Sequence, residues 1–246
     1  TAVGSGAASG TTSGDSNTAI GYETMDQNTT GSANTAVGAL ALERNTTANH
    51  NTAVGFEALE ENTTGQYNTA VGSLALDSNT TADGNTAVGY ACLRTNTTGT
   101  QNVAFGTNTL DANTTGLYNA SLGYNSLGSS TTGGQNVAVG HEALQANTTA
   151  FYNTAVGKGS LYSNTTGTQN TGVGIQALYL NTTGSNNTAL GAYALDSSTT
   201  SSYNTAVGYL ALEDNTTGAY NTAVGQAALD ASTTGTGNTA FGSEAL

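Results

Sequence analysis

The stretch N-T-A-V-G-Y-L-A-L-E-D-N-T-T-G-A-Y, from Asn204 to Tyr220, is one copy of a seventeen-residue repeat that fills a chain of 246 residues. We number the positions of the repeat from 0, at this asparagine, to 16. A period held without insertion over such a length is typical of one supersecondary unit copied end to end, each copy contacting only its neighbours. Asparagine occupies position 0 in fourteen consecutive copies: Asn17, Asn34, Asn51, Asn68, Asn85, Asn102, Asn119, Asn136, Asn153, Asn170, Asn187, Asn204, Asn221 and Asn238.

The first half of the repeat predicts a β-strand that ends in a corner. Position 1 is mostly Thr, position 2 is Ala in all but Ser121 and Gly172, and position 3 is a large apolar residue in every copy. Such alternation, with β-branched residues, favours a strand. Position 4 is Gly from Gly4 to Gly242 without exception, which is typical of a positive φ or of a backbone with no room for a Cβ. We expect positions 3 and 8, the second occupied almost entirely by Leu, to form the core.

Seventeen residues are too few for two helices and a turn and too many for one strand. We therefore expect an all-β fold, a parallel β-solenoid with two short strands per coil and about 14 coils, forming one elongated domain over residues 1–246. In this arrangement the position 0 amides would form a hydrogen-bonded ladder from coil to coil. The complete absence of Pro suits a backbone whose N–H groups are needed between coils. The chain begins and ends inside a copy, so we expect it to be a segment of a longer protein.

Composition argues against several partners. The formal charge is −13 with only three basic residues, so we expect no nucleic-acid binding and no attraction to anionic membranes. No apolar run has transmembrane length, and we expect no membrane insertion. Each coil offers only about two large apolar side chains, a small core that favours oligomerisation. The small residues at position 2 would allow close packing around an axis, and we expect a homotrimer, which could extend into a longer filament.

The unit N-T-A-V-G, as at Asn34–Gly38, Asn51–Gly55 and Asn221–Gly225, resembles the S-V-A-I-G unit of YadA-like trimeric autotransporter adhesin heads. The stretch Asn204–Gly218 is similar to the N-T-A-V-G-Y-x-A-L-x-x-N-T-T-G arrays of phage tail-fibre-like proteins. The resemblance covers the whole chain and implies a left-handed parallel β-roll, three chains per fibre and a role in surface display or attachment. This sequence departs from the adhesin heads in its longer period and its additional N-T-T-G half.

The N-T-T segment at position 11 is also an N-glycosylation sequon. The same position holds Thr11, Ser130, Ser198 and Ser232. Ser and Thr cannot carry an N-glycan but can make a turn hydrogen bond similar to that of Asn, and this favours a structural role. Two further sequons begin at Asn119 and Asn186, and the threonine pairs could carry O-glycans. The candidate glycosylation residues at position 11 are Asn28, Asn45, Asn62, Asn79, Asn96, Asn113, Asn147, Asn164, Asn181 and Asn215.

Three variable positions have recurring chemistry. Tyr recurs at positions 16 and 5, where it could stack on sugars of a receptor or pack between neighbouring chains or coils. Position 9 is acidic in eight copies; calcium could bridge such carboxylates, but the ligands do not converge within one coil, so we expect a solvated face and no metal. Arg94 interrupts this row and would relieve its repulsion. The acidic residues are Asp26, Glu43, Glu60, Asp77, Asp111, Asp196, Glu213 and Asp230.

Nothing in the sequence indicates catalysis. The two histidines, His50 and His141, are far apart at different positions of the repeat, and the single cysteine, Cys92, replaces a small residue. We expect no enzyme activity, no catalytic or cofactor-binding residues and no cofactor. The sequence favours a structural or adhesive fibre segment, outside the cell, on its surface or on a virion, whose partners beyond itself would be surface glycans or a receptor. The alternatives are a glycan-coated extracellular filament and an ice-binding solenoid with stacked threonines.

Overall fold

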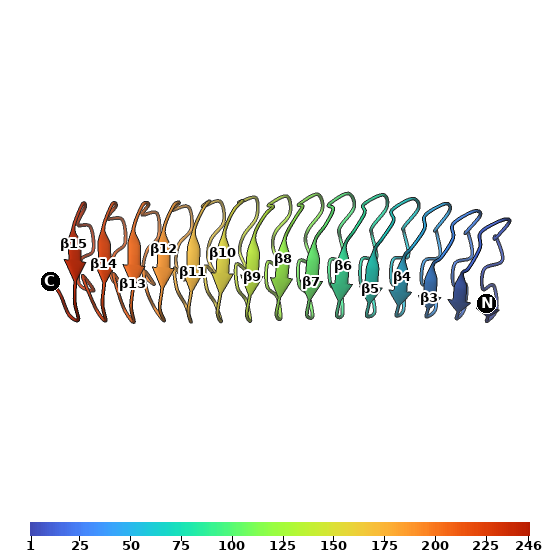
Figure 1. The fold of residues 1–246 in the computed structure, drawn as a ribbon, viewed down its shortest axis with the longest axis horizontal. Coiled ribbons are helices and arrows are strands. Elements are labelled where there is room, and N and C mark those ends of the chain that lie inside the picture. Colours follow the sequence, from blue (N-terminus) through green and yellow to red (C-terminus); the bar gives the residue numbers. More distant parts are fainter. The chain divides into compact units, whose positions relative to one another are not determined.

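A computed structural model describes all 246 residues and divides them into two compact units, Thr1–Ala120 and Ser121–Leu246. Both units consist of the same coil, repeated every seventeen residues, and contain strands and turns but no helix. Each coil has one strand arrow, and the loop residues that follow it close the coil (Figure 1). No segment therefore has the helical length and hydrophobicity that a membrane-spanning helix requires.

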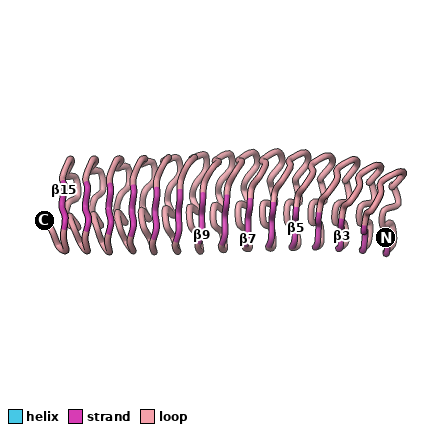
Figure 2. The backbone as a smooth tube through the Cα atoms, viewed as in Figure 1, coloured by secondary structure: helices cyan, strands magenta, loops and turns pink.

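Every strand occupies positions 1 to 3 of the repeat, and the rest of the coil is turn and loop (Figure 2). The sequence predicted two strands per coil, and this was wrong for the second half. The strands are β1 (Ala2–Val3), β2 (Thr18–Ile20), β3 (Thr35–Val37), β4 (Thr52–Val54), β5 (Thr69–Val71), β6 (Thr86–Val88), β7 (Val103–Phe105), β8 (Ala120–Leu122), β9 (Val137–Val139), β10 (Thr154–Val156), β11 (Thr171–Val173), β12 (Thr188–Leu190), β13 (Thr205–Val207), β14 (Thr222–Val224) and β15 (Thr239–Phe241).

Within each unit, neighbouring strands pair in parallel and in register with the repeat. In the first unit Thr52 of β4 lies opposite Thr69 of β5. In the second unit Thr188 of β12 lies opposite Thr205 of β13. Each position of the repeat therefore stacks on itself, and the predicted all-β parallel solenoid with seventeen-residue coils is confirmed.

Hydrogen bonds between coils continue around the loops as well as along the strands. The N–H of Thr52 at position 1 donates to the carbonyl of Asn68 in the next coil at 2.9 Å, and the N–H of Gly55 donates to Val37 in the preceding coil at 2.9 Å. At position 8, far from the strand, the N–H of Leu59 donates to the carbonyl of Ala75 at 3.0 Å. Because N–H groups in both halves of the coil are engaged, proline would remove an inter-coil bond at many positions.

Left-handed residues bend the second half of the coil and prevent a second strand. Positions 6, 8 and 16 have positive φ, for example 55° at Glu57, 54° at Leu59 and 60° at Tyr67. None of these positions holds Val, Ile or Thr in any copy, as the steric cost of a β-branched side chain in this region requires. Position 4 is more demanding: Gly55 has φ of 143°, and a Cβ there would lie 2.4 Å from the carbonyl oxygen of Gly72.

The interior takes the small side chain of the strand and leaves the large one outside. Ala53 at position 2 and Leu59 at position 8 are fully buried, whereas Val54 at position 3 is 36% exposed. The prediction that position 8 belongs to the core is confirmed, and the prediction that position 3 does is wrong. Because successive strand residues point to opposite sides, only one of positions 2 and 3 can face inward. The buried apolar residues are mainly at positions 2, 7 and 8.

The left-handed core position yields a first prediction. Leu76 is fully buried and has φ of 52°. We expect Leu76→Ile, which conserves volume, to lower the free energy of unfolding by about 1–3 kcal/mol, because a β-branched residue is strained there. Leu76→Met, the residue that Met25 supplies at the same position, should cost less than about 1.5 kcal/mol. Urea unfolding followed by circular dichroism measures both, and equal stability of the two variants would contradict this account.

Candidate functional site

The position 0 asparagines connect successive coils within each unit. In the first unit, Oδ1 of Asn51 accepts the backbone N–H of Asn68 at 2.9 Å, and its Nδ2 donates to the carbonyl of Gly65 at 2.8 Å. In the second, Asn170 makes the same bonds with Asn187 and Gly184, at 3.0 and 2.8 Å. The side-chain oxygen of each position 0 asparagine thus bonds mainly to a backbone N–H of the next coil rather than to the side-chain amide of the next asparagine. These side chains replace backbone bonds that the narrow interior would otherwise leave unmade.

The position 11 asparagines form a second ladder, from amide to amide. Nδ2 of Asn62 donates to Oδ1 of Asn45 at 3.2 Å and to the carbonyl of Gly65 at 3.0 Å. All ten of these sequon asparagines are fully buried, so the nitrogen that an N-glycan would occupy lies inside the coil. Of the two sequons outside this position, Asn119 is also buried, and Asn186 is half-buried. The geometry favours the structural role of the motif.

Serine substitutions show what the second ladder contributes. Oδ1 of Asn181 and Oδ1 of Asn215 are buried and have no hydrogen-bond partner. In both cases the next coil has serine at position 11, Ser198 and Ser232. The side chain of Ser198 is too short to reach Asn181 in the preceding coil, and its hydroxyl pairs with the hydroxyl of Ser201 at 2.5 Å. Each serine therefore leaves a buried acceptor without a donor, a loss that the asparagines avoid.

The two threonines after position 11 lie in different environments. At position 12, Oγ1 of Thr63 donates to the carbonyl of Thr80 in the next coil at 3.0 Å, and the same bond recurs along both units. At position 13 the side chain of Thr64 is exposed. Position 12 therefore belongs to the coil, and position 13 is available to solvent or to modification.

The outer face of the strands presents an apolar row beside a threonine row. At position 3, Val173 is 37% exposed and Leu190 is 39% exposed, and Thr188 at position 1 lies half-buried on the same face. In the first unit, Phe56 and Tyr90 at position 5 extend the apolar row and are 48% and 53% exposed. Regularly spaced apolar side chains of this exposure are a candidate contact surface.

The acidic row at position 9 is electrostatically unfavourable. Burial raises the pKa of Glu60 to about 7, with further increases from Asp77 and Glu57. Burial, with a smaller contribution from Glu213, raises the pKa of Asp196 to about 6. Arg94 relieves the row locally, because its Nε lies 3.1 Å from Oδ1 of Asp111. No group of three or more His, Cys, Asp or Glu side chains is arranged to hold a metal ion.

These pKa shifts predict an unusual pH dependence. A carboxyl group whose pKa is higher in the folded than in the unfolded state stabilises the fold below the unfolded pKa, and this contribution is lost as pH rises through the folded pKa. We expect the free energy of unfolding to fall between pH 4.5 and pH 7 as Glu60 ionises. Glu60→Gln should raise stability at pH 8 and leave it unchanged near pH 4.

Thermal unfolding across this pH range measures the effect. Asp15→Asn, which removes the same charge outside the position 9 row, serves as the control. Stability that rises from pH 4.5 to pH 8, or an equal response of the two variants, would contradict the assignment to Glu60.

Aromatic rings stack between adjacent coils. Tyr203 and Tyr220 at position 16 have centroids 5.0 Å apart and planes inclined by 2°, and His50 stacks on Tyr67 at 5.3 Å. Tyr203 and Tyr220 nevertheless remain 53% and 63% exposed. Packing between coils and exposure to a ligand are therefore compatible in the same tyrosines.

Each residue considered for catalysis has a partner of its own or a buried environment. The ring of His141 stacks on Tyr124 at 5.2 Å, and its Nδ1 lies 3.3 Å from Oε2 of Glu142. His50 belongs to the other unit. Cys92 is buried, its thiol donates to the carbonyl of Ala104 at 3.3 Å, and burial raises the pKa of that thiol to about 12. A thiol with such a pKa is a poor nucleophile at neutral pH.

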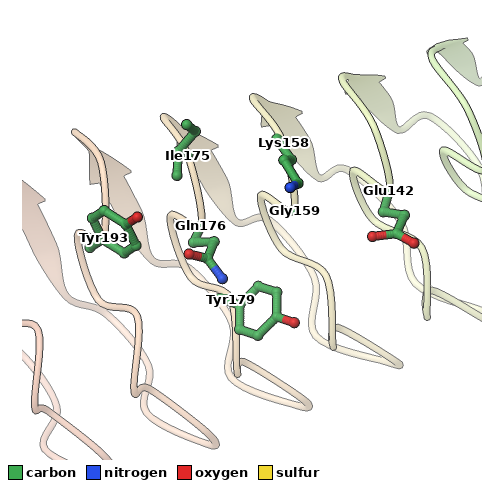
Figure 3. A pocket seen from close by; sticks show the side chains of 7 residues that line it. All are labelled: Glu142, Lys158, Gly159, Ile175, Gln176, Tyr179 and Tyr193. Atoms are coloured by element: carbon green, nitrogen blue, oxygen red, sulfur yellow. The ribbon is translucent and has the colours of Figure 1, made fainter.

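A hollow beside Gly159 interrupts the regular surface of the second unit. It has a volume of about 330 Å³ and lies where Gly159 replaces the side chain that neighbouring coils carry at position 6. Figure 3 shows Lys158 beside Gly159, with Gln176 and Tyr179 on the following coil. Sequence reasoning did not identify this hollow; the available signal was a glycine at a position that holds a side chain in nearly every other copy.

The fold and these surfaces define the class of the protein: a parallel β-solenoid of seventeen-residue coils held together by buried asparagine and threonine ladders. Comparison with models of known families, with curated proteins and with solved structures finds no match.

Proposed function

We propose that the chain is a structural and adhesive fibre segment, a rigid trimeric rod of left-handed coils displayed outside the cell or on a virion, without enzymatic activity. The observation that carries the proposal is that the most constant positions of the repeat serve to build the coil. Asn at positions 0 and 11 and Thr at position 12 join neighbouring coils, and Gly at position 4 lets their backbones approach. Ala at position 2 and Leu at position 8 fill the interior. Residues so engaged extend and stiffen a stack, and they leave recognition to the variable positions. The resemblance to adhesin heads and tail fibres agrees with this role.

Association would use the outer face of the strands. The sequence argument for a trimer relied on the small residues of position 2, but Ala189 and its equivalents face the interior of their own coil. The exposed apolar row of position 3, including Val173 and Leu190, is the surface that a second and third copy would cover. Burial of this row in a homotrimer would add apolar area to a core that is small in each chain.

Sedimentation equilibrium tests the trimer. We expect a mass three times the 24.4 kDa of one chain. Val173→Lys should shift the equilibrium toward monomers, because it places a charge in the apolar row without entering the interior. Thr183→Lys, at the exposed position 13, should leave the mass unchanged. A folded wild-type monomer at micromolar concentration would refute the trimer.

Two alternatives have specific support. For a glycan-coated filament, the exposed threonines of position 13, such as Thr64, favour O-linked over N-linked sugars. Mass spectrometry of native material showing unmodified Thr and Asn would exclude it. For an ice-binding solenoid, Thr and Val at positions 1 and 3 share the outer face of consecutive strands from β10 to β14, with Leu190 as the one exception to Val. Absence of thermal hysteresis at millimolar concentration would exclude it.

A further inference from the structure

The hollow beside Gly159 is built from four successive coils of the second unit. Glu142 comes from the first, Lys158 and Gly159 from the second, Ile175, Gln176 and Tyr179 from the third, and Tyr193 from the fourth. Its volume of about 330 Å³ is near the lower end of the ~300–1,000 Å³ typical of small-molecule pockets. It therefore has room for one small ring or two linked rings.

Glycine creates the space. Position 6 holds Glu142 in the preceding coil and Gln176 in the following one, so Gly159 removes one side chain from the row. A Cβ on Gly159 would lie 3.4 Å from two ring carbons of Tyr179 and 3.6 Å from Cγ of Gln176. A larger side chain at this point would fill the hollow against the tyrosine ring.

Both tyrosine walls are held by a second aromatic ring. Tyr179 stacks on Tyr162, with centroids 5.0 Å apart and planes inclined by 18°. Tyr193 lies edge-on to Tyr209, with centroids 6.1 Å apart. Tyr162 and Tyr179 occupy position 9, which is acidic in most other copies, so aromatic rings replace carboxylates at this place. Walls fixed in this way lose little side-chain entropy when a ligand binds.

The charge of the hollow differs from that of the rest of the chain. The chain has a formal charge of −13, yet Glu142 and Lys158 are the only charged residues between Asp111 and Asp196. Both line the hollow, and Lys158 is exposed and takes part in no ion pair. The lining thus combines one carboxylate, one ammonium group and one amide with no net charge.

We propose that this hollow binds a neutral saccharide, with a pyranose ring against the tyrosines. Carboxylate and amide oxygens accept hydrogen bonds from sugar hydroxyls, and the ammonium and amide N–H groups donate to them. A tyrosine ring provides an apolar face for the C–H groups of the sugar and a hydroxyl at its edge. Because attraction of an ion to one member of the Glu142–Lys158 pair is offset by repulsion from the other, neither sign of charge gains an advantage, and the lining suits an uncharged polyhydroxylated ligand.

This inference rests on the proposed adhesive function and gives it a site and a ligand class. The hollow uses positions 5, 6 and 9 of the repeat and neither of positions 1 and 3, through which the chains would associate. Failure of saccharide binding would leave the trimer untouched, because sedimentation tests that separately.

Saturation-transfer NMR on the full chain tests the proposal. The neutral probes are the methyl pyranosides of glucose, galactose, mannose and N-acetylglucosamine, and the acidic probe is glucuronate. We expect at least one neutral probe to bind with a dissociation constant in the millimolar range, as suits a shallow single-ring site. Absence of binding by every neutral probe up to about 50 mM, well beyond that range, overturns the proposal. Binding of glucuronate alone overturns it as well.

Variants locate the binding. Gly159→Leu should fill the hollow while keeping the fold, because Leu40, Leu74 and Leu210 occupy position 6 in other coils with φ of 62°, 61° and 60°. We expect Gly159→Leu to abolish binding and Tyr179→Ala to weaken it about tenfold.

Two matched controls should bind as the wild type does. Gly84→Gln fills a separate hollow beside Tyr67, in the manner of Gln101 at the same position of the next coil. Tyr220→Ala removes an exposed tyrosine outside the site. Circular dichroism confirms folding of each variant. Binding that survives Gly159→Leu, or that Gly84→Gln weakens equally, places the sugar elsewhere and overturns the assignment.

Discussion

The fold depends on the satisfaction of buried polar groups in an interior too narrow for a conventional core. Each interior coil buries apolar side chains, but most coils also bury two asparagines, and their side chains bond to backbone and side-chain groups of neighbouring coils. A buried carbonyl or N–H without a partner costs about 1–3 kcal/mol, comparable to the gain from burying one leucine. The amide ladders are therefore as important to stacking as the apolar residues. Where the next coil has Ser198 or Ser232 instead of Asn, the side-chain oxygen of Asn181 or Asn215 is left buried without a partner.

This constraint explains why the regular part of the chain carries so little specific chemistry. Asn51 or Thr63 cannot contact a ligand while bonding the next coil. The acidic row of position 9 is a repeated feature that opposes folding at neutral pH, since burial, and to a lesser extent neighbouring carboxylates, raise the pKa values of Glu60 and Asp196. Specific recognition requires a break in the pattern. The substitution of glycine at 159 and tyrosine at 162 and 179, in a segment nearly free of charge, is such a break.

Sequence reasoning predicted the features that follow from periodicity. An unbroken period indicates stacked coils, and an Asn column with Ser and Thr substitutes at position 11 indicates a structural hydrogen bond. It failed where size was taken as a sign of burial. Val54 is larger than Ala53, yet the strand must turn one of them outward, and only the smaller fits inside. The absence of β-branched residues at positions 6, 8 and 16 was a readable signal of left-handed backbone that would have excluded the second strand. For the hollow the only signal was the glycine at 159, and its lining could not be predicted, because that requires knowing which side chains of four successive coils lie together.

The most direct test of the central claim is the free energy of unfolding of Asn68→Leu. Asn68 is fully buried, accepts the N–H of Asn85 at 2.9 Å and donates to the carbonyl of Ala82 at 2.8 Å. Leucine has a similar size and is more apolar, so a fold governed by hydrophobic burial would gain stability from it. If the ladders govern the fold, the variant loses more than about 2 kcal/mol, because the buried N–H of Asn85 loses its acceptor and the carbonyl of Ala82 keeps only the longer bond from Nδ2 of Asn79, at 3.2 Å. Unchanged or increased stability of Asn68→Leu would contradict the account.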